Sequence, residues 1–141
     1  MNILVPGGSG QVGQILKRHF QAHGHQVVIL SRGSENPTAR WDGKTLGDWQ
    51  QHVDESDVVI NLAGRTVNCR YTETNLRQMM DSRVDSTHVV GQAIQQSPSP
   101  PKVWLQMSTA TIYAHRFDAA NDEATGIIGG DGDCWIACPT T

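Results

Sequence analysis

The sequence predicts an α/β fold with a doubly wound parallel sheet, from three observations. A short apolar strand at residues 2–5 runs directly into a glycine-rich segment at 7–13. An amphipathic helix follows this segment at once, which is the order of a βαβ unit that binds a dinucleotide. Strand-like and helix-like segments then alternate along the chain, as a sheet covered by helices on both faces requires. With right-handed crossovers, the predicted strand order is 3-2-1-4-5.

The individual elements follow from apolar periodicity and from cap and breaker residues. The first helix, about 11–23, places Val12, Ile15, Leu16 and Phe20 on one stripe, and Gly24 ends it. The second strand, 25–30, is apolar on both faces over residues 27–30 and is therefore predicted to be buried. The remaining expected elements are a loop at 31–37, a short strand at 40–42, a small helix at 46–53, a strand at 57–62, a helix at 72–96, a strand at 102–107 and a loop at 118–132. Thr72 is a suitable cap for the long helix, and the proline-rich run 97–101 terminates it.

Composition limits the class of protein. The chain has 141 residues, a net charge of −3 and a sequence pI near 6.0, which favours one domain and gives no reason to expect nucleic acid or an anionic membrane as a partner. No apolar run is long enough to span a bilayer, and we expect no signal peptide. Three cysteines are an odd number at low density, which favours a reducing, cytoplasmic location. The histidines are scattered, and we expect no metal site.

The glycine-rich segment is the first candidate binding site. Gly7, Gly10 and Gly13 would allow a tight turn, close approach of the backbone to a pyrophosphate, and close packing of helix on strand. The amide groups around Gln11 and Val12 at the start of the helix would then face the phosphates.

The end of the second strand indicates which dinucleotide binds. A protein that prefers NAD usually has a carboxylate there to accept from the ribose 2′-hydroxyl, whereas this chain has Ser31 and Arg32. A guanidinium binds a 2′-phosphate that a carboxylate would repel, so NADP is favoured over NAD. The alternative is that Arg32 is a solvated loop residue.

Two further segments fall at the carboxyl edge of the sheet, where ligands of such folds bind. Leu62, Ala63 and Gly64 end the fourth strand, and small residues there would let the backbone approach a ribose; a simple tight turn is an equal alternative. Asp42, next to Trp41, could flank the adenine, although a tryptophan is more often a core residue.

Several motifs occur in order and carry a resemblance. They are Gly7 to Gly13, Ser31-Arg32, Trp41-Asp42-Gly43, Asn61-Leu62-Ala63-Gly64, Arg70-Tyr71-Thr72, Ser82-Arg83-Val84 with Thr87, and the run from Ser108 to Tyr113. Over residues 1–130 the chain resembles the extended short-chain dehydrogenase/reductases. Within them it is most similar to the atypical epimerase family branch, described as nucleoside-diphosphate-sugar epimerases or cell division inhibitor-like proteins. The resemblance implies a Rossmann fold that binds NAD(P) and acts on sugar nucleotides or other hydroxyl and carbonyl compounds.

The resemblance also implies roles for Ser108 and Thr109. Thr109 matches the catalytic serine or threonine of the superfamily, and Ser108 would lie at the cofactor; a hydroxyl bound to its local backbone is the equal alternative for Thr109. The acid/base motif Y-x-x-x-K of the superfamily has no counterpart in residues 131–141, and Phe117 stands four residues after Tyr113. We therefore expect a Rossmann domain at 1–130, truncated before its last strands, and a tail of loop or disorder at 131–141.

Two main hypotheses follow. The chain is the NADP-binding domain of an epimerase or reductase-like protein with a small-molecule substrate such as a sugar nucleotide. Alternatively, it is a non-catalytic NADPH-binding regulatory module. A methyltransferase with the same glycine loop is a third reading, against which Arg32 counts. An uncovered sheet edge also favours a homo-oligomer.

Overall fold

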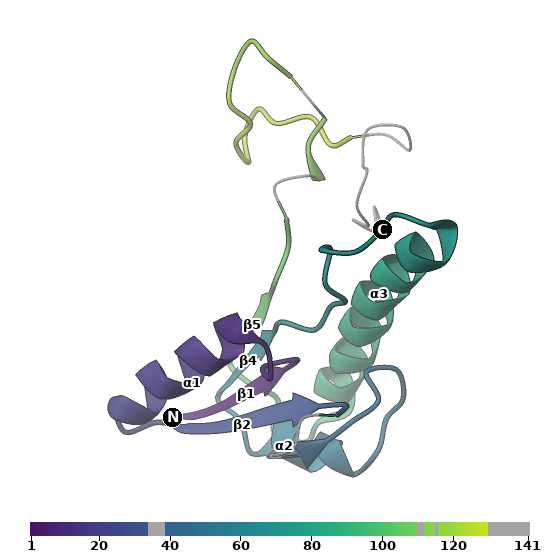
Figure 1. Cartoon of the computed structure of the whole chain (residues 1–141). Coiled ribbons are helices and arrows are strands. Elements are labelled where there is room, and N and C mark those ends of the chain that lie inside the picture. Colours follow the sequence, from purple (N-terminus) through teal and green to yellow (C-terminus); the bar gives the residue numbers. More distant parts are fainter. Residues whose placement is uncertain (34–38, 110–111, 115, 130–141) are drawn as a thin grey trace. The chain divides into compact units, whose positions relative to one another are not determined.

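In this computed structural model the strands form one parallel sheet in the order β3-β2-β1-β4-β5 (Figure 1), as predicted. The structure describes residues 1–33, 39–109, 112–114 and 116–129. The strands are β1 Asn2–Pro6, β2 Gln26–Ser31, β3 Ala39–Arg40, β4 Val58–Asn61 and β5 Val103–Gln106. The helices are α1 Gln11–Ala22, α2 Gln51–Asp54, preceded by a 3-10 turn at Asp48–Gln50, and α3 Glu73–Gln96. The expected helices and strands are thus confirmed to within a few residues. Residues 34–37 and 130–132 of the expected loops, and the expected tail at 131–141, lie outside the described residues.

The chain divides into two compact units. The first comprises residues 1–64 and 82–107 and contains the whole sheet, α1, α2 and most of α3. The second comprises the remaining residues. Its described part holds the first turns of α3 and an irregular stretch in which Tyr113 forms an isolated antiparallel bridge with Ile128.

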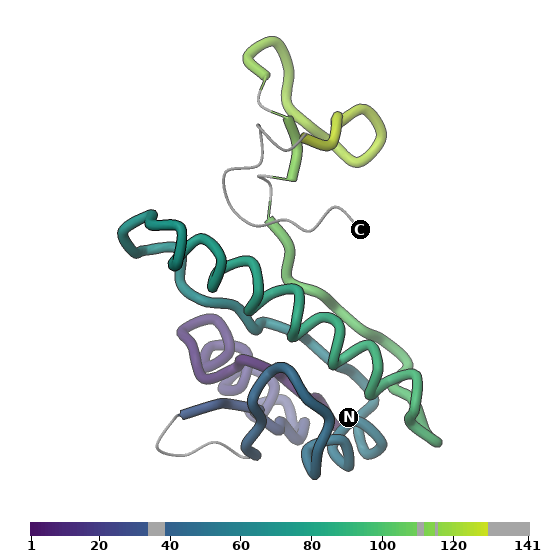
Figure 2. The backbone as a smooth tube through the Cα atoms, turned by 90° about the vertical axis from the view of Figure 1, so that its right-hand side faces the viewer, coloured from purple at the N-terminus to yellow at the C-terminus, as the bar shows by residue number. Residues whose placement is uncertain are grey.

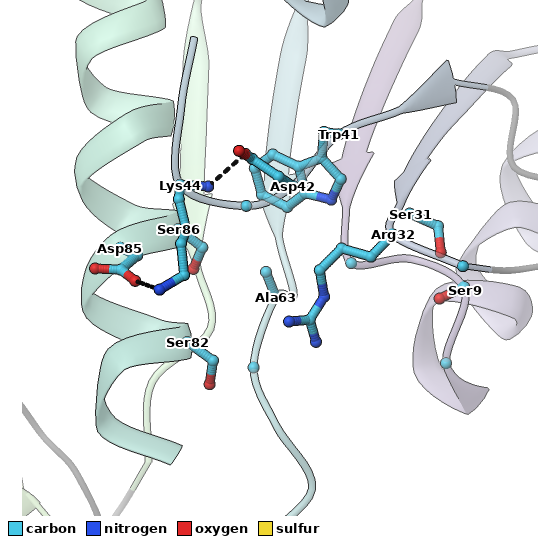
Figure 3. Close-up of a pocket in the computed structure, with 15 residues that line it drawn as sticks. Ser9, Ser31, Arg32, Trp41, Asp42, Lys44, Ala63, Ser82, Asp85 and Ser86 are labelled. Carbon is cyan, nitrogen blue, oxygen red and sulfur yellow. Dashed lines mark hydrogen bonds and ion pairs between the residues drawn. The ribbon is translucent and has the colours of Figure 1, made fainter. Parts of the chain in front are cut away.

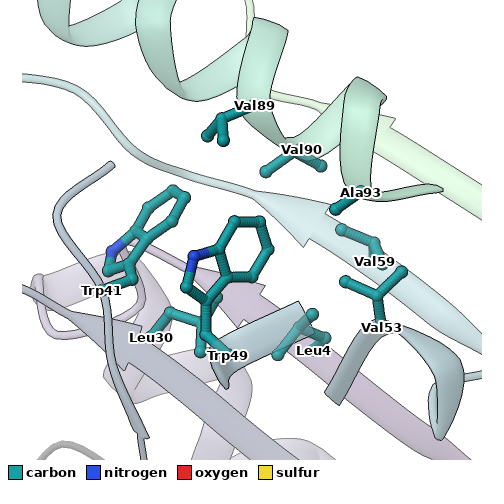
Figure 4. Close-up of a cluster of buried hydrophobic side chains, with 9 residues drawn as sticks. All are labelled: Leu4, Leu30, Trp41, Trp49, Val53, Val59, Val89, Val90 and Ala93. Atoms are coloured by element: carbon teal, nitrogen blue, oxygen red, sulfur yellow. The ribbon is translucent and has the colours of Figure 1, made fainter. Parts of the chain in front are cut away.

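The first unit buries apolar side chains on both faces of the sheet. In β1, Leu4 joins a core with α2 and α3 (Figure 4). Ile3 and Val5 alternate with it and belong to a second core, against which Phe20 of α1 packs. The alternation is the two-residue period of a strand, and it explains why residues 3–5 of β1 are all apolar. The α3 face holds the larger cluster: Leu4, Leu30, Trp41, Trp49, Val53, Val59, Val89, Val90 and Ala93.

Coverage of the sheet is less complete than the sequence suggests. Of the predicted α1 stripe, Phe20 packs on the core and Leu16 is half-buried, but Val12 and Ile15 are each 50% exposed. All the residues of β5 are exposed as well. The expected two-sided cover therefore holds for β1, β2 and β4 but not for the β5 edge. Figure 2 shows the long α3 from a second side.

The predicted helix boundaries are confirmed in atomic detail. Gly24 follows α1 with φ +78°, a left-handed conformation that favours glycine. The Thr72 hydroxyl accepts the Asn75 N–H at 3.3 Å and so caps α3. At the other end of α3, the Ser97 hydroxyl donates to Asp54 at 2.6 Å. Among the described residues, no helix has the length and apolar character that crossing a bilayer demands.

Candidate dinucleotide-binding site

A pocket of about 460 Å³ lies within the first unit at the carboxyl edge of the sheet (Figure 3). Four of its wall segments directly follow parallel strands β1, β2, β3 and β4, and the fifth belongs to α3. Parallel strands deliver their carboxyl ends to one edge, which is where ligands bind in such sheets. The lining residues are Gly7, Ser9, Gly10, Ser31, Arg32, Gly33, Trp41, Asp42, Gly43, Lys44, Ala63, Gly64, Ser82, Asp85 and Ser86.

Gly7 makes the turn that leaves β1. Its φ is +74°, and its N–H donates to the Leu30 carbonyl at 2.9 Å. A Cβ at this position would lie 2.5 Å from the Ala63 Cα, so a side chain would collide with the backbone that follows β4. Because Gly7 has no side chain, the loop after β1 can contact the loop after β4 at the pocket.

Gly13 and Gly10 have different roles at the start of α1. A Cβ on Gly13 would lie 2.3 Å from the Cα and carbonyl oxygen of Gly8, so this glycine lets the helix pack against the preceding loop. A Cβ on Gly10 would meet no heavy atom within 4 Å, so the described protein itself does not require a glycine there.

The first turn of α1 has the features of an anion site. Gly10 is its N-cap, the turn has no acidic residue, and no hydrogen bond from a described side chain caps it. A helix N-terminus in this state attracts an anion through free amides and the helix dipole. The open space at Gly10 and these amides fit the close approach of a pyrophosphate.

The end of β2 places a cation, Arg32, in the wall of the pocket. Ser31 ends the strand at 5% exposure, and its carbonyl accepts the Trp41 N–H. Arg32 is exposed, and its guanidinium extends over the pocket in Figure 3. A guanidinium at this position suits a phosphate ester on the adenosine ribose.

Asp42 shapes the loop after β3. Its carboxylate accepts the N–H groups of Lys44 at 2.8 Å and Thr45 at 2.9 Å, and the Thr45 hydroxyl at 2.6 Å. The hydroxyl of Thr45, followed by these backbone groups, lowers the pKa of Asp42 to about 2. Asp42 thus lines the pocket while its carboxylate holds a turn that presents Lys44.

Lys44 and Trp41 complete this wall. The Lys44 Nζ lies 2.8 Å from Asp85 Oδ2 on α3 (Figure 3). Trp41 is 7% exposed and meets Trp49 edge to face, with ring centroids 5.4 Å apart. Trp41 is a core residue, as expected, and it also lines the pocket; its place beside the adenine stays a prediction.

Asn61 organises the turn after β4. It is fully buried, its Nδ2 donates to the Gln106 side chain at 2.9 Å, and its Oδ1 accepts the Ala63 N–H at 3.0 Å. These bonds fix Ala63 where it adjoins Gly7. Sequence reasoning had assigned no function to Asn61.

The pocket gathers part of the predicted site. Gly7, Gly10, Ser31, Arg32, Asp42, Ala63 and Gly64 all line it. Gln11, Val12, Gly13 and Leu62 do not: Gly13 packs beneath the loop, and Leu62 packs on the α1 side of the core.

Ser108 and Thr109 belong to the second unit. There the Thr109 carbonyl accepts the Ile112 N–H at 3.3 Å. The role of Thr109 beside a nicotinamide stays a prediction.

Sequence reasoning missed the α3 wall and Lys44. Ser82, Asp85 and Ser86 stand three and four residues apart, which puts them on one helical face. These polar residues share one face of a helix that also packs on the core, and this pattern could have predicted the α3 wall. No sequence signal marks Lys44, because its ion-pair partner, Asp85, lies 41 positions away along the chain.

Comparison with known proteins agrees with this geometry. Residues 3–127 match the model of the NAD dependent epimerase/dehydratase family. The human epimerase family protein SDR39U1 is 31% identical over 136 residues, covering 94% of this chain, and YfhF of Bacillus subtilis is 34% identical over 120 residues, covering 80%. A crystal structure of human SDR39U1 with NADPH superposes with a TM-score of 0.75 over 89% of the chain, at 31% identity.

A nucleoside-diphosphate sugar epimerase from Corynebacterium glutamicum is also similar, with a TM-score of 0.76 and 25% identity over 95% of this chain and 28% of its own. The chain spans 44% of the human relative, 39% of YfhF and 42% of the human crystal structure. The family model matches most of the chain, and two relatives are more than 30% identical to it. The chain belongs to the NAD-dependent epimerase/dehydratase family.

Proposed function

We propose that the chain is the NADP-binding domain of an epimerase or reductase-like protein that acts on a hydroxyl or carbonyl compound such as a sugar nucleotide. The observation that carries the proposal is the open cradle at Gly10, at an uncapped helix N-terminus, in the same pocket as Arg32. The human relative SDR39U1 was crystallised with NADPH, which supports the choice of NADP over NAD.

The phosphates and the ribose of the cofactor each have a matching group in the chain. The amides at Gly10 to Gly13 hold the pyrophosphate, and Arg32 with Ser31 binds the 2′-phosphate. Ala63 and Gly64 let the backbone approach the ribose, and Thr109 binds the oxygen of the substrate. Bound NADPH supplies a hydride to a carbonyl carbon. The low density of cysteine supports a cytoplasmic location.

The second candidate is a non-catalytic module that binds NADPH. The chain has two tyrosines, Tyr71 and Tyr113, and neither has a lysine four residues later. A tyrosine that acts as acid and base needs a cationic neighbour such as that lysine. This feature favours binding without turnover by these 141 residues.

Calorimetric titration with NADPH, NADH and S-adenosylmethionine tests the proposal. We expect NADPH to bind more tightly than NADH, and S-adenosylmethionine not to bind. Arg32→Glu should weaken NADPH roughly 100-fold and NADH only a few-fold, because a charge-assisted bond to the 2′-phosphate contributes about 1.5–3 kcal/mol and the reversed charge adds repulsion. Arg18→Glu, on the exposed side of α1, is the matched control. Equal losses for the two dinucleotides would show that Arg32 does not contact the 2′-phosphate.

NADPH absorbance with a panel of sugar nucleotides and simple carbonyl compounds separates the two candidates. Oxidation of NADPH that depends on a substrate supports the enzyme. Tight NADPH binding without any turnover supports the regulatory module.

A further inference from the structure

The carboxyl end of α1 carries two histidines that the proposed function does not use. His19 lies in the last turn of the helix and His23 is its C-cap, so the two stand one turn apart on the same face. Both residues are exposed, and their ring centroids lie 4.4 Å apart with 38° between the ring planes. From the sequence alone we expect no metal site at the scattered histidines. The structure shows that two of the rings are adjacent.

The separation of the two rings fits the binding of one metal ion by both. An imidazole nitrogen lies roughly 2.0–2.1 Å from a bound zinc ion, which puts the ring centroid about 3 Å from the ion. Two rings bound at a right angle, as tetragonal Cu²⁺ or Ni²⁺ prefers, then have centroids about 4.5 Å apart. The observed 4.4 Å is close to this value. The helix therefore already holds His19 and His23 at the distance that one ion requires.

A hydrogen bond determines which nitrogen of His23 can bind an ion. His23 Nδ1 lies 2.8 Å from the His19 carbonyl oxygen, which only accepts, so Nδ1 carries a proton and donates it. In the neutral ring the lone pair is then on Nε2. Histidines that bind metals commonly donate their other ring N–H to a backbone carbonyl, which orients the ring and makes the binding nitrogen more basic. His23 already has this arrangement.

The surroundings of the two rings favour one class of cation. The carboxyl end of a helix has a partial negative charge, which attracts cations. Lys17 and Arg18 oppose this attraction, but the Arg18 Nε donates to the Gln14 carbonyl at 3.3 Å, one turn toward the amino end of α1. Within the described part of the chain, no third histidine, cysteine or acidic residue completes a cluster with the pair. Two imidazoles without a carboxylate favour copper, nickel or zinc over magnesium or calcium, with water as the remaining ligand.

We propose that His19 and His23 form a binding site for one divalent ion of the nickel, copper and zinc group. Each ring supplies one nitrogen, and that of His23 is Nε2. The site lies at the carboxyl end of α1, whereas the proposed pyrophosphate site lies at the amino end, so the two inferences are independent. Because the ion needs both rings one turn apart, it binds the folded chain more tightly than the unfolded chain and raises the Tm.

Calorimetric titration of the whole chain with Ni²⁺ tests the proposal, after alkylation of the three cysteines so that no thiolate binds the ion. We expect one ion per chain, tighter binding of Cu²⁺ than of Ni²⁺, and no binding of Mg²⁺. His19→Gln and His23→Gln should each weaken Ni²⁺ binding at least about tenfold. His88→Gln is the matched control, because His88 is also an exposed histidine on a helix, α3. This control should bind Ni²⁺ as the wild-type chain does.

Two further measurements locate the ion. Paramagnetic Cu²⁺ should first broaden the amide NMR signals of residues 19–23, and Ni²⁺ should raise the Tm of the wild-type chain but not that of His19→Gln or His23→Gln. If the wild-type chain binds no Ni²⁺, or if both variants bind it unchanged, the proposal is wrong. It is also wrong if His88→Gln loses as much affinity as they do, because the ion then lies elsewhere. Circular dichroism verifies that each variant folds, and NADPH titration tests the proposed function separately.

Discussion

Two glycines three residues apart, Gly10 and Gly13, should respond to alanine in opposite ways. At Gly13 a Cβ would lie 2.3 Å from backbone atoms of Gly8, and backbone cannot move aside as a flexible side chain can. Overpacking of this kind costs typically about 1–3 kcal/mol, whereas alanine returns about 1 kcal/mol of helix propensity. The gain offsets part of the cost, so we expect Gly13→Ala to lower the free energy of unfolding by up to about 2 kcal/mol, which corresponds to a fall in Tm of up to roughly 6 °C.

At Gly10 the same change should leave the fold almost untouched. Its φ of −74° and ψ of 176° suit any residue, and a Cβ would meet nothing within 4 Å. Loss of a preferred N-cap glycine costs about 0.5 kcal/mol, and the smaller entropy of the unfolded chain offsets a similar amount. The added methyl group would instead occupy the space of the pyrophosphate, so NADPH affinity should fall at least about tenfold, which is 1.4 kcal/mol.

Thermal unfolding with and without NADPH measures both effects on one instrument. The ligand should raise the Tm of the wild-type chain but hardly that of Gly10→Ala. If Gly10→Ala unfolds as easily as Gly13→Ala, the open space at Gly10 is not real. If it binds NADPH as the wild-type chain does, the pyrophosphate does not lie at this helix end.

The remaining predictions concern the supports of the pocket and of α3. Asn61→Leu should cost about 2 kcal/mol in urea unfolding and also weaken NADPH binding, because the Ala63 N–H loses its acceptor; unchanged binding would separate Asn61 from the site. The pKa of Asp42 falls from 3.8 to about 2 on folding, so its carboxylate stabilises the fold above pH 3.8 and loses this effect as the pH falls through 2. Asp42→Asn should therefore flatten the pH dependence of stability between pH 4 and 2, and a profile parallel to the wild type would contradict the assignment. Thr72→Ala removes the cap that accepts the Asn75 N–H and should lower stability by roughly 1 kcal/mol in the same unfolding assay; no change would show that solvent serves equally well.

The sequence by itself determined the elements, their order and the glycine turn. Apolar periodicity, Gly24 and Thr72 are local signals, and the structure shows each within a residue or two of its expected place. Topology followed as well, because right-handed crossovers leave few orders open to alternating strands and helices. The family was also within reach, since its motifs are short and lie in sequence order.

Only the tertiary structure decided which side chains meet. In the sequence, Asn61 is an ordinary residue at the end of a strand. The structure shows that its side-chain amide binds Gln106, 45 residues away, and the Ala63 N–H. Lys44 and Asp85 lie 41 positions apart, and no sequence pattern marks the ion pair between them. The different roles of Gly10 and Gly13 depend on which atoms a Cβ at each position would meet. Spacing along a chain encodes the conformation of its backbone, whereas contacts across a sheet depend on register and packing, which exist only once the chain has folded.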